Sequence, residues 1–533
     1  MNQTIYPIGI QNFEKIRKDG YLYVDKTALV YQLANTGSYY FLSRPRRFGK
    51  SLLLSTLEAY FQGKKELFEG LAIANLEKEW MEYPILHLDL NAEKYDSPDR
   101  LDAEKYSDAG ALESILRRFL NLWEDRWGKD DRETTPSDRF TGVIRRAYEK
   151  TGRRVVVLVD EYNKPLLQAL ENAELQEAYR AILKAFYGVL KTMDGYIRLA
   201  FLTGVTKFGK VSVFSDLNNL DDISMREPYA AICGITEAEL LTYFDGDIHK
   251  LASSLELTYD ETRSLLKKRY DGYHFVANVP GIYNPFSLLN TFKYMRPEDY
   301  WFETGTPSYL VELLKHTHYD LYELANTETD ADVLNSIDST SSNPVPVIYQ
   351  SGYLTIKDYD SRFGIYKLGF PNLEVEEGFV KYLLPFYTSV SAPKTPFEIG
   401  RFVREVENGD YDAFFRRLQS FFADTPYEVI AGQKPERDTE LHYQNVLFIV
   451  FRLIGLYAKV EYHTSNGRID LVVQTDRYIY IMEFKLNGSA EDALRQIDEK
   501  RYALPFANDG RKVFKIGVNF SSETRNIERW VVE

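Results

Sequence analysis

A lysine and a hydroxyl residue near the start of the chain have the spacing of a phosphate-binding loop. Residues 44–51 read RPRRFGKS and follow a short apolar run. The usual pattern is GxxxxGK[ST], in which backbone N–H groups surround the phosphates, the lysine reaches the terminal phosphates and the hydroxyl binds Mg²⁺. Gly49, Lys50 and Ser51 match this pattern, whereas Arg44 stands where the first glycine is expected. The motif alone is therefore a partial match for an ATP site.

Two acidic residues strengthen the interpretation as an ATP site. Asp160 and Glu161 directly follow the apolar, β-branched run VVVLV. In open α/β sheets, ligands bind beyond the carboxyl ends of the strands. An Asp in that place can hold Mg²⁺, and the next Glu can polarise the attacking water. Two acids are a costly way to end a buried strand for structural reasons alone. We therefore expect Ser51 and Asp160 to hold Mg²⁺ and Glu161 to be catalytic.

A polar residue that senses the γ-phosphate is expected at the end of the next strand. The run YIRLAFLT is followed by GVT, so Thr203 and Thr206 both qualify, and the sequence does not choose between them. Arg46 and Arg47 lie inside the loop at residues 44–51, and they either face the phosphates or form a solvated basic loop. The expected nucleotide-binding set is Arg46, Arg47, Phe48, Gly49, Lys50, Ser51 and Thr203.

A second group of acidic residues near the C-terminus has the composition of a metal-dependent phosphodiesterase site. Asp470 lies in GRID, and Glu483 and Lys485 lie in EFK. A hairpin turning at residues 475–477 would place Asp470 opposite residues 482–483, and Glu483 and Lys485 would share a face of their strand. Such acids among apolar neighbours are costly unless they are paired or metal-bound. The alternative is a surface ion pair between Glu483 and Lys485.

Residues outside this hairpin complete the expected metal site. Glu440 near the start of the preceding helix could supply another carboxylate, and Glu461 is a weaker candidate. Gln496 and Lys500 are four apart on the following helix and so share a face. Hard oxygen ligands of this kind suit Mg²⁺, and a nearby lysine can orient water. The expected metal ligands here are Glu440, Asp470 and Glu483, with Lys485 and Gln496 as further catalytic residues.

The elements that must position these residues can be read from the hydrophobic pattern. Strands alternating with helices in the first part of the chain indicate a doubly wound parallel α/β sheet. Expected strands lie at 39–43, 84–89, 154–159 and 196–203, and expected helices begin at Lys50 and span 111–127 and 175–193. The segment 237–330 is expected to be helical. Two short strands within 347–370 suggest the wing of a winged-helix-like unit. A helix at 400–423 and an apolar helix from Thr439 precede the strand–strand–strand–helix–strand order of the C-terminal region.

Composition limits the classes of protein that fit. The 533 residues carry a net charge of −14, which argues against a protein coated in basic surface for nonspecific binding to nucleic acid. The single cysteine excludes an internal disulfide and a Cys-based zinc site. We see neither a signal peptide nor a membrane span, so we expect a cytoplasmic protein. From Lys434 to Glu533 there are fifteen Lys/Arg and fifteen Asp/Glu, fewer basic residues than a nucleic-acid-binding domain usually shows.

Taken together, the motifs resemble a known bacterial family. PIGIQNFEKIR, GYLYVDKT, RPRRFGKSLL, LVDEYNKP, LTGVTKF, YDGYHF, IYNPFSLL and GRIDLVV…YIMEFK are similar to segments of AAA-ATPase-like proteins with a C-terminal PD-(D/E)XK nuclease-superfamily domain. The resemblance covers nearly the whole chain, and the family also has Arg at the position of Arg44. It implies ATP binding through Lys50 and Ser51, with Mg²⁺ and water handled by Asp160 and Glu161. It also implies a nuclease core at Glu440, Asp470, Glu483 and Lys485, with Gln496 as accessory, although Ile469 replaces the usual Pro.

These observations predict four segments and one main function. The segments are an AAA-like P-loop domain (1–236), a helical lid region (237–326), a winged-helix-like region (327–398) and a nuclease-like domain (399–533). The main hypothesis is an ATP-binding, ATP-hydrolysing protein coupled to a Mg²⁺-dependent nuclease that acts on DNA or RNA, by analogy in defence or mobile-element biology. The alternatives are an ATP-regulated module that binds nucleic acid or protein through an inactive nuclease fold, and a scaffold with neither activity. The sequence leaves open DNA or RNA, an oligomer or a monomer.

Overall fold

The computed structural model describes residues 4–92, 110–169, 172–207, 210–214, 217, 219–304, 310, 313–314, 317, 319–325, 327–335, 343–388, 390–423, 435–455, 458–465 and 468–533. For residues 92, 211, 212, 303, 325, 392, 435–440, 461–465 and 468–470 it describes the backbone only. The chain divides into two compact units, which are described one at a time. The N-terminal unit comprises Met1–Thr304 and Thr327–Leu373, and the C-terminal unit comprises Gly305–Asn326 and Glu374–Glu533.

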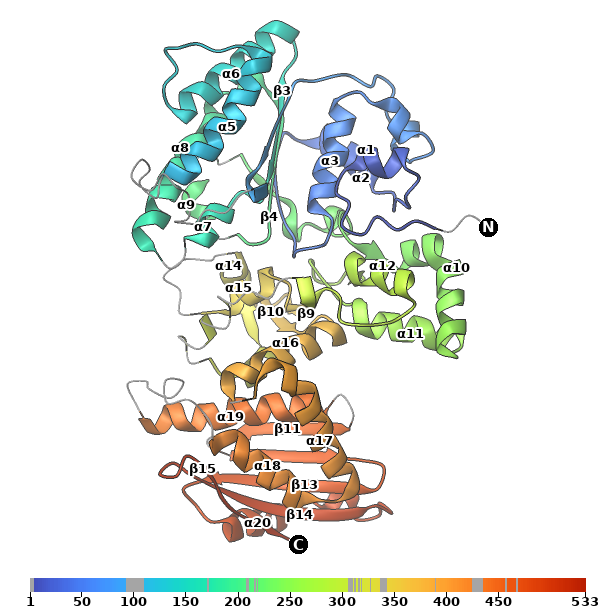
Figure 1. Cartoon of the computed structure of the whole chain (residues 1–533), viewed down its shortest axis with the longest axis vertical. Helices are drawn as coiled ribbons and strands as arrows, with labels where there is room; N and C mark the ends of the chain where they lie inside the picture. Colours follow the sequence, from blue (N-terminus) through green and yellow to red (C-terminus); the bar gives the residue numbers. More distant parts are fainter. Residues whose placement is uncertain are drawn as a thin grey trace. The chain divides into compact units, whose positions relative to one another are not determined.

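The N-terminal unit is built on a five-stranded sheet, two of whose strands, β3 and β4, are labelled in Figure 1. The strand order is β2-β3-β4-β1-β5. All neighbouring strands in it are parallel. The strands are β1 (Tyr39–Ser43), β2 (Ile85–Asp89), β3 (Val155–Asp160), β4 (Ile197–Gly204) and β5 (Asp221–Asp222). Every residue of β1 and β3 is buried, as expected for parallel strands covered on both faces. The predicted parallel α/β sheet is thus confirmed.

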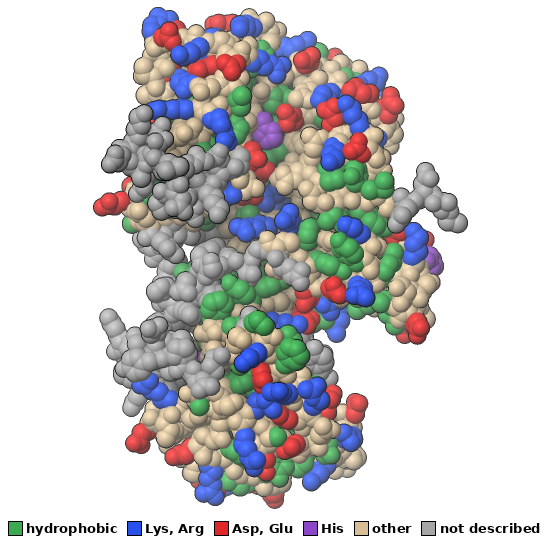
Figure 2. All heavy atoms as spheres, viewed as in Figure 1, with side chains coloured by type: hydrophobic (Ala, Val, Ile, Leu, Met, Phe, Trp, Pro, Cys, Tyr) green, Lys and Arg blue, Asp and Glu red, His purple; other side chains and the backbone are tan. Residues whose placement is uncertain are grey.

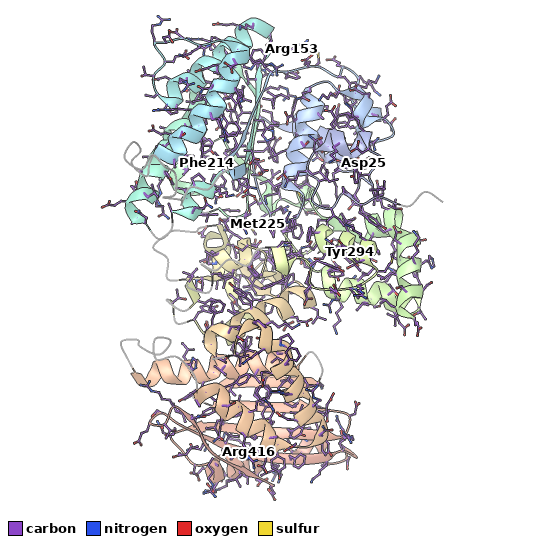
Figure 3. The ribbon with its side chains drawn as sticks, in the orientation of Figure 1. Asp25, Arg153, Phe214, Met225, Tyr294 and Arg416 are labelled. Carbon is purple, nitrogen blue, oxygen red and sulfur yellow. The ribbon has the colours of Figure 1, made fainter. Side chains whose placement is uncertain are left out.

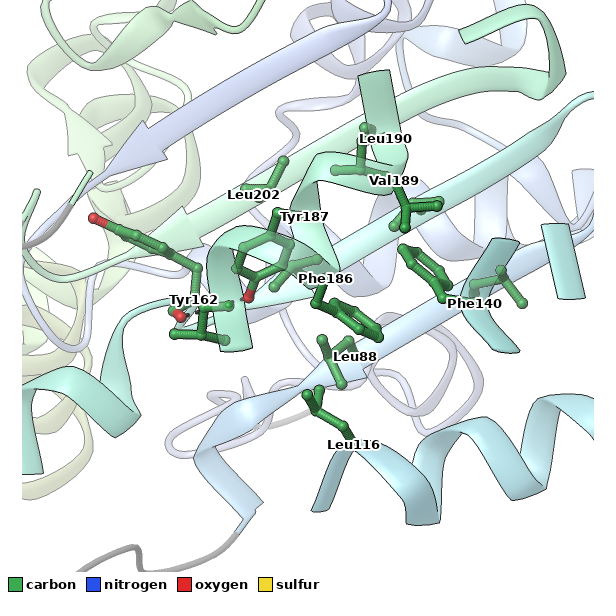
Figure 4. Close-up of a cluster of buried hydrophobic side chains, with 14 of the residues drawn as sticks. Leu88, Leu116, Phe140, Tyr162, Phe186, Tyr187, Val189, Leu190 and Leu202 are labelled. Carbon is green, nitrogen blue, oxygen red and sulfur yellow. Dashed lines mark hydrogen bonds between the residues drawn. The ribbon is translucent and has the colours of Figure 1, made fainter. Parts of the chain in front are cut away.

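Helices lie on both sides of this sheet in Figure 1, and a loop at residues 44–49 joins β1 to helix α3. The helices of this part are α1 (Phe13–Lys18), α2 (Thr27–Thr36), α3 (Lys50–Phe61), α4 (Ile73–Leu76), α5 (Gly110–Trp127), α6 (Pro136–Thr151), α7 (Lys164–Gln168), α8 (Ala173–Thr192) and α9 (Lys210–Val213). Helices α5, α6 and α8 bury their apolar stripes in one core with the strands (Figure 4). Within that core the rings of Phe140 and Phe186 stack with centroids 4.4 Å apart. The large apolar area removed from water holds these helices on the sheet.

The N-terminal unit also contains further helices and two small sheets. They are α10 (Glu237–Leu255), α11 (Tyr259–Tyr270), α12 (Pro285–Tyr294), α14 (Ala331–Asn335), α15 (Val345–Gln350), the pair β6 (Ile235–Thr236) and β7 (Ile282–Tyr283), and the antiparallel sheet β8 (Glu328–Asp330), β10 (Ile365–Gly369) and β9 (Thr355–Asp360). The predicted hairpin is present as β9 and β10. Residues 347–350, however, were predicted as strand and form helix α15, because a short buried apolar run has no decisive periodicity and proline suits a first helical turn.

The C-terminal unit contains a second five-stranded sheet, in the order β11-β12-β13-β14-β15. Only β13 and β14 pair in parallel, and α20 connects them. The elements are α16 (Leu373–Tyr387), α17 (Thr395–Asn408), α18 (Tyr411–Ala423), α19 (Pro435–Ile454), β11 (Lys459–Ser465), β12 (Arg468–Gln474), β13 (Tyr478–Leu486), α20 (Ala490–Glu499), β14 (Lys512–Ser521) and β15 (Asn526–Val532). Aromatic contacts from α18 and α19 cover one face, and α20 covers the other.

The single helix predicted at 400–423 is wrong, because two helices occupy this segment. Helix α17 ends at Gly409, whose φ of 80° is left-handed and whose backbone N–H bonds to Glu405 O. Glycine tolerates this conformation and so terminates helices. Asp410 then accepts a hydrogen bond from Ala413 N at the start of α18. The apolar periodicity continues through both helices and hides the break.

Candidate nucleotide and metal sites

The loop between β1 and α3 has the backbone of a phosphate-binding loop. Gly49 has a φ of 98°, and α3 begins at the next residue. Arg47 is also left-handed, with a φ of 66°. The N-terminus of α3 presents free N–H groups and the positive end of the helix dipole, which together favour a bound anion. The loop therefore suits phosphate groups.

Lys50 lies in this loop and contacts the acid that follows β3. Its Nζ is 3.2 Å from Glu161 Oε1, and its side chain is 5% exposed. The same nitrogen donates to the backbone oxygens of Arg44 at 3.1 Å and Pro45 at 3.4 Å. Glu161 itself has a φ of 53°, and its Oε2 accepts a hydrogen bond from Val205 N at 3.2 Å. A strained backbone at a strand end is typical of functional sites.

Asp160 joins the loop to β4 through two hydroxyl groups. Ser51 Oγ donates to Asp160 Oδ2 at 2.5 Å, and Thr203 Oγ1 donates to Asp160 Oδ1 at 2.6 Å. The amide of Asn163 instead donates to Thr206 Oγ1 at 3.1 Å. Of the two candidate threonines, Thr203 is thus the one bonded to the acid. The hydroxyl and carboxylate oxygens of Ser51 and Asp160 are hard ligands, so this pair fits Mg²⁺.

The second candidate site lies on the face of the C-terminal sheet that α20 covers. Asp470 pairs with Glu483 in the antiparallel register of β12 and β13, as the hairpin prediction required. Glu483 is 0% exposed. Its Oε1 accepts a hydrogen bond from Gln496 Nε2 of α20 at 2.5 Å. The structure thus brings Glu483 and Gln496 together and places the backbone of Asp470 beside them.

A glycine on the neighbouring strand lets α20 approach this face closely. Gly517 pairs with Glu483 in the parallel register of β13 and β14. A Cβ atom at Gly517 would lie 2.0 Å from Ala490 O and 2.5 Å from Leu494 N, which no side chain could occupy. Lys485 is half-buried two residues beyond Glu483 and pairs in register with Asn519. This close contact holds the helix that carries Gln496 against Glu483.

Some expected metal ligands fall outside the described side chains. The backbones of Glu440, Glu461 and Asp470 lie in α19, β11 and β12, but their side chains are outside the described part. Within the described part of the chain, no three His, Cys, Asp or Glu side chains form a metal-binding cluster. The buried carboxylate of Glu483 next to the backbone of Asp470 is the observation that fits a divalent cation. Lys500 caps α20 and is exposed.

Comparison with known proteins identifies both units. A model described as "Predicted AAA-ATPase" matches residues 7–214, and a PD-(D/E)XK nuclease superfamily model matches residues 438–530. A protein from Azotobacter chroococcum mcd 1, described as "Uncharacterized protein in vnfD 5′region", is 35% identical over 539 residues. That alignment covers 100% of this chain and 99% of the relative. This chain belongs to the AAA-ATPase-like family with a C-terminal PD-(D/E)XK nuclease-superfamily domain. Within the described part of this family member, no helix is both long and apolar enough to span a membrane.

The other predicted loop residues occupy different positions in this AAA-ATPase-like unit. Arg46 and Arg47 are exposed, and the guanidinium of Arg47 lies 5.1 Å from the ring centroid of Phe286. Phe48 is 1% exposed, and its ring contacts those of Tyr273 and Phe275. The side chain of Phe48 therefore packs against the protein, which leaves its backbone to face a phosphate.

A further acid at the ATPase-like site was missed at the sequence level. Asp89 ends β2 and pairs in register with Asp160 on β3. Burial, together with the charges of Asp160 and Glu161, raises the pKa of Asp89 above its ordinary value. The signal was available, because an acid also ends the predicted strand PILHLD.

A contact between β2 and α3 could not be predicted from the sequence. His87 Nδ1 of β2 lies 2.9 Å from Glu58 Oε2 of α3.

Proposed function

We propose that the N-terminal unit binds and hydrolyses ATP with Mg²⁺. The observation that carries this proposal is the linked set Lys50–Glu161 and Ser51–Asp160–Thr203, in which loop, β3 and β4 meet through polar atoms. Lys50 would exchange Glu161 for the β- and γ-phosphates, and Ser51 with Asp160 would hold the metal. Glu161, released from Lys50, would orient the attacking water. Thr203 would report the γ-phosphate through its bond to Asp160.

The proposed activity of the C-terminal unit is metal-dependent cleavage of a phosphodiester bond in DNA or RNA. Support comes from the fully buried carboxylate of Glu483, its bond to Gln496 and its register with Asp470. A bound Mg²⁺ would supply Lewis-acid stabilisation of the phosphate. Asp470, Glu483 and Glu440 would hold it, while Lys485 would position water. Gln496 keeps the Glu483 carboxylate in one orientation. Control of foreign nucleic acid or of mobile elements would suit such a pair of activities.

The test compares cleavage of single- and double-stranded DNA and RNA with Mg²⁺ or Mn²⁺, with and without ATP. Lys50→Ala should abolish ATP binding, whereas Lys15→Ala, an exposed lysine of the same unit, should keep it. Asp470→Asn should abolish cutting at unchanged affinity for nucleic acid. Asp476→Asn, in the exposed turn of the same hairpin, is the matched control and should cut normally. Cutting that survives Asp470→Asn refutes the assigned site.

The second candidate is an ATP-regulated module that binds nucleic acid or protein without cutting. The charge distribution favours it, because Lys/Arg and Asp/Glu balance from Lys434 to Glu533 and are interspersed on the face seen in Figure 2. ATP binding that depends on Lys50, with no cutting under any condition, would select this candidate. Absence of ATP binding by the wild type would overturn both.

A further inference from the structure

Arg44 takes the place of the first glycine of the phosphate-binding loop, and its side chain is buried. It is 1% exposed. Nη1 donates to the backbone oxygens of Ser43 at 2.9 Å and Ser224 at 2.8 Å, and Nη2 donates to Tyr229 O at 3.2 Å. These bonds tie the loop to the segment after β5. The guanidinium thus faces protein carbonyl groups and is unavailable to a phosphate.

An aromatic ring from the YDGYHF segment completes the environment of Arg44. The guanidinium carbon lies 4.0 Å from the centroid of the Phe275 ring. Phe275 also packs against Phe48 of the loop, with centroids 5.4 Å apart. Tyr273 contacts Phe48 at 4.7 Å. A cation over a ring face is attracted to it, and more strongly when both are removed from water. Phe275 therefore contacts the loop at two residues, Arg44 and Phe48.

Pro45 and Arg46, which follow Arg44 in the loop, also contact residues far along the chain. A Cβ atom at Gly352 would lie 2.6 Å from Pro45 Cγ, so this glycine allows the close approach. Trp301 Nε1 donates to Arg46 O at 2.9 Å. Arg44, Pro45, Tyr273 and Phe275 line one cavity together with Met225, which is labelled in Figure 3.

We propose that Arg44 is a positioning residue that fixes the phosphate-binding loop in its binding conformation through Ser224, Tyr229 and Phe275. This inference rests on the proposed ATP-binding function. A glycine-rich loop attains the conformation by backbone freedom, and ordering it on binding costs entropy. Here the arginine orders the loop before any nucleotide arrives. A loop that is already ordered binds more tightly, because less conformational freedom is lost.

The decisive variant is Arg44→Gly, because it restores the usual GxxxxGKS pattern. If the side chain of Arg44 were incidental, this variant would bind ATP as well as the wild type. We expect instead an ATP Kd that is about tenfold weaker or more, since three bonds to carbonyl groups and a cation–π contact are lost. Arg44→Lys should recover only part of the affinity, because an ammonium cannot match the guanidinium fork. Phe275→Leu leaves Arg44 in place and should weaken ATP binding in the same direction.

The experiment measures ATP affinity by calorimetry and hydrogen exchange of the peptide spanning residues 43–52 in full-length protein without nucleotide. Faster exchange of this peptide in Arg44→Gly and Phe275→Leu, with weaker ATP binding, supports the proposal. The matched control is Arg198→Gly, since Arg198 at the start of β4 also donates to a backbone oxygen and lies over two rings. Unchanged loop exchange in Arg44→Gly, or equal loss of ATP affinity in Arg198→Gly, overturns it. If the wild type binds no ATP, the proposed function fails, while loop exchange still tests the role of Arg44.

Discussion

A buried histidine should make the stability of the C-terminal unit depend on pH. His442 of α19 is 6% exposed, and its Nε2 has no hydrogen-bond partner within the described part of the chain. Its ring stacks against Tyr387 with centroids 6.3 Å apart. Burial lowers the pKa of His442 from 6.5 to about 4. The folded unit therefore holds this imidazole neutral under conditions in which the unfolded chain protonates it.

The sign and size of this pH dependence follow from the difference between the pKa of His442 in the folded and in the unfolded chain. Between about pH 6.5 and about pH 4 the unfolded state binds more protons, so the free energy of unfolding falls as pH falls. The full contribution is present above the unfolded pKa of 6.5. With about 1.4 kcal/mol for each pKa unit, the whole loss is about 3 kcal/mol, of which about 2 kcal/mol is lost by about pH 5.

The assay compares the urea unfolding of the wild type and of His442→Leu at about pH 8 and about pH 5. Pulse proteolysis monitors the unfolding, and the fragments that it yields identify the C-terminal unit. Other titrating groups contribute equally to both proteins, so the comparison isolates His442. The wild type should lose about 2 kcal/mol more than the leucine variant on acidification. Equal losses in both proteins would refute a neutral, buried imidazole at this position.

Two other substitutions test the packing of the two units, and a third tests the backbone of the phosphate-binding loop. Gly517→Ala should destabilise the C-terminal unit by about 1–3 kcal/mol in urea unfolding, because its Cβ would overlap α20, whereas Gly510→Ala, which faces open space, should be neutral. Arg139→Ala should cost about 3–5 kcal/mol in thermal unfolding of the N-terminal unit, since it leaves Glu124 buried at 5% exposure without its bidentate partner; a cost below about 1 kcal/mol would contradict a buried pair. Gly49→Ala should cost about 1 kcal/mol or more, because its φ is 98°, and should weaken ATP binding in calorimetry; unchanged binding would show that the loop tolerates a side chain there.

The sheet of the N-terminal unit could be predicted because its strands carry their own signal. A run such as residues 155–159 is apolar throughout and mostly β-branched, and its acidic end marks the edge where ligands bind. The pairing of Asp470 with Glu483 was also predictable, since counting outward from a tight turn fixes the register of a hairpin. The same counting applies wherever one turn joins two strands.

Long-range contacts are the part that the sequence could not supply. Arg44 stands in the sequence only as the residue that replaces the first glycine of the loop, whereas in the structure carbonyl groups far along the chain bind its side chain. Asn372 Nδ2 donates to Asp271 O at 2.9 Å, and Thr355 Oγ1 donates to His274 O at 3.0 Å. Such contacts place residues 327–373 in the N-terminal unit, a grouping that no local pattern encodes. The predicted four-segment division stays a prediction.

Both candidate sites place a carboxylate where folding alone would not favour one. Asp160 is 4% exposed and Glu483 is 0% exposed; the rest of the strand of Asp160 is apolar, and Glu483 directly follows Ile479, Tyr480, Ile481 and Met482 on its own strand. Burying an ionised carboxylate costs several kcal/mol, which hydrogen bonds from neutral hydroxyl or amide groups offset only in part. Ser51 and Thr203 at one site, and Gln496 at the other, orient the carboxylate oxygens through hydrogen bonds. An apolar residue would stabilise either strand better. A Mg²⁺ ion held by these oxygens, as proposed for both sites, would offset this cost and would link the packing of each unit to its proposed chemistry.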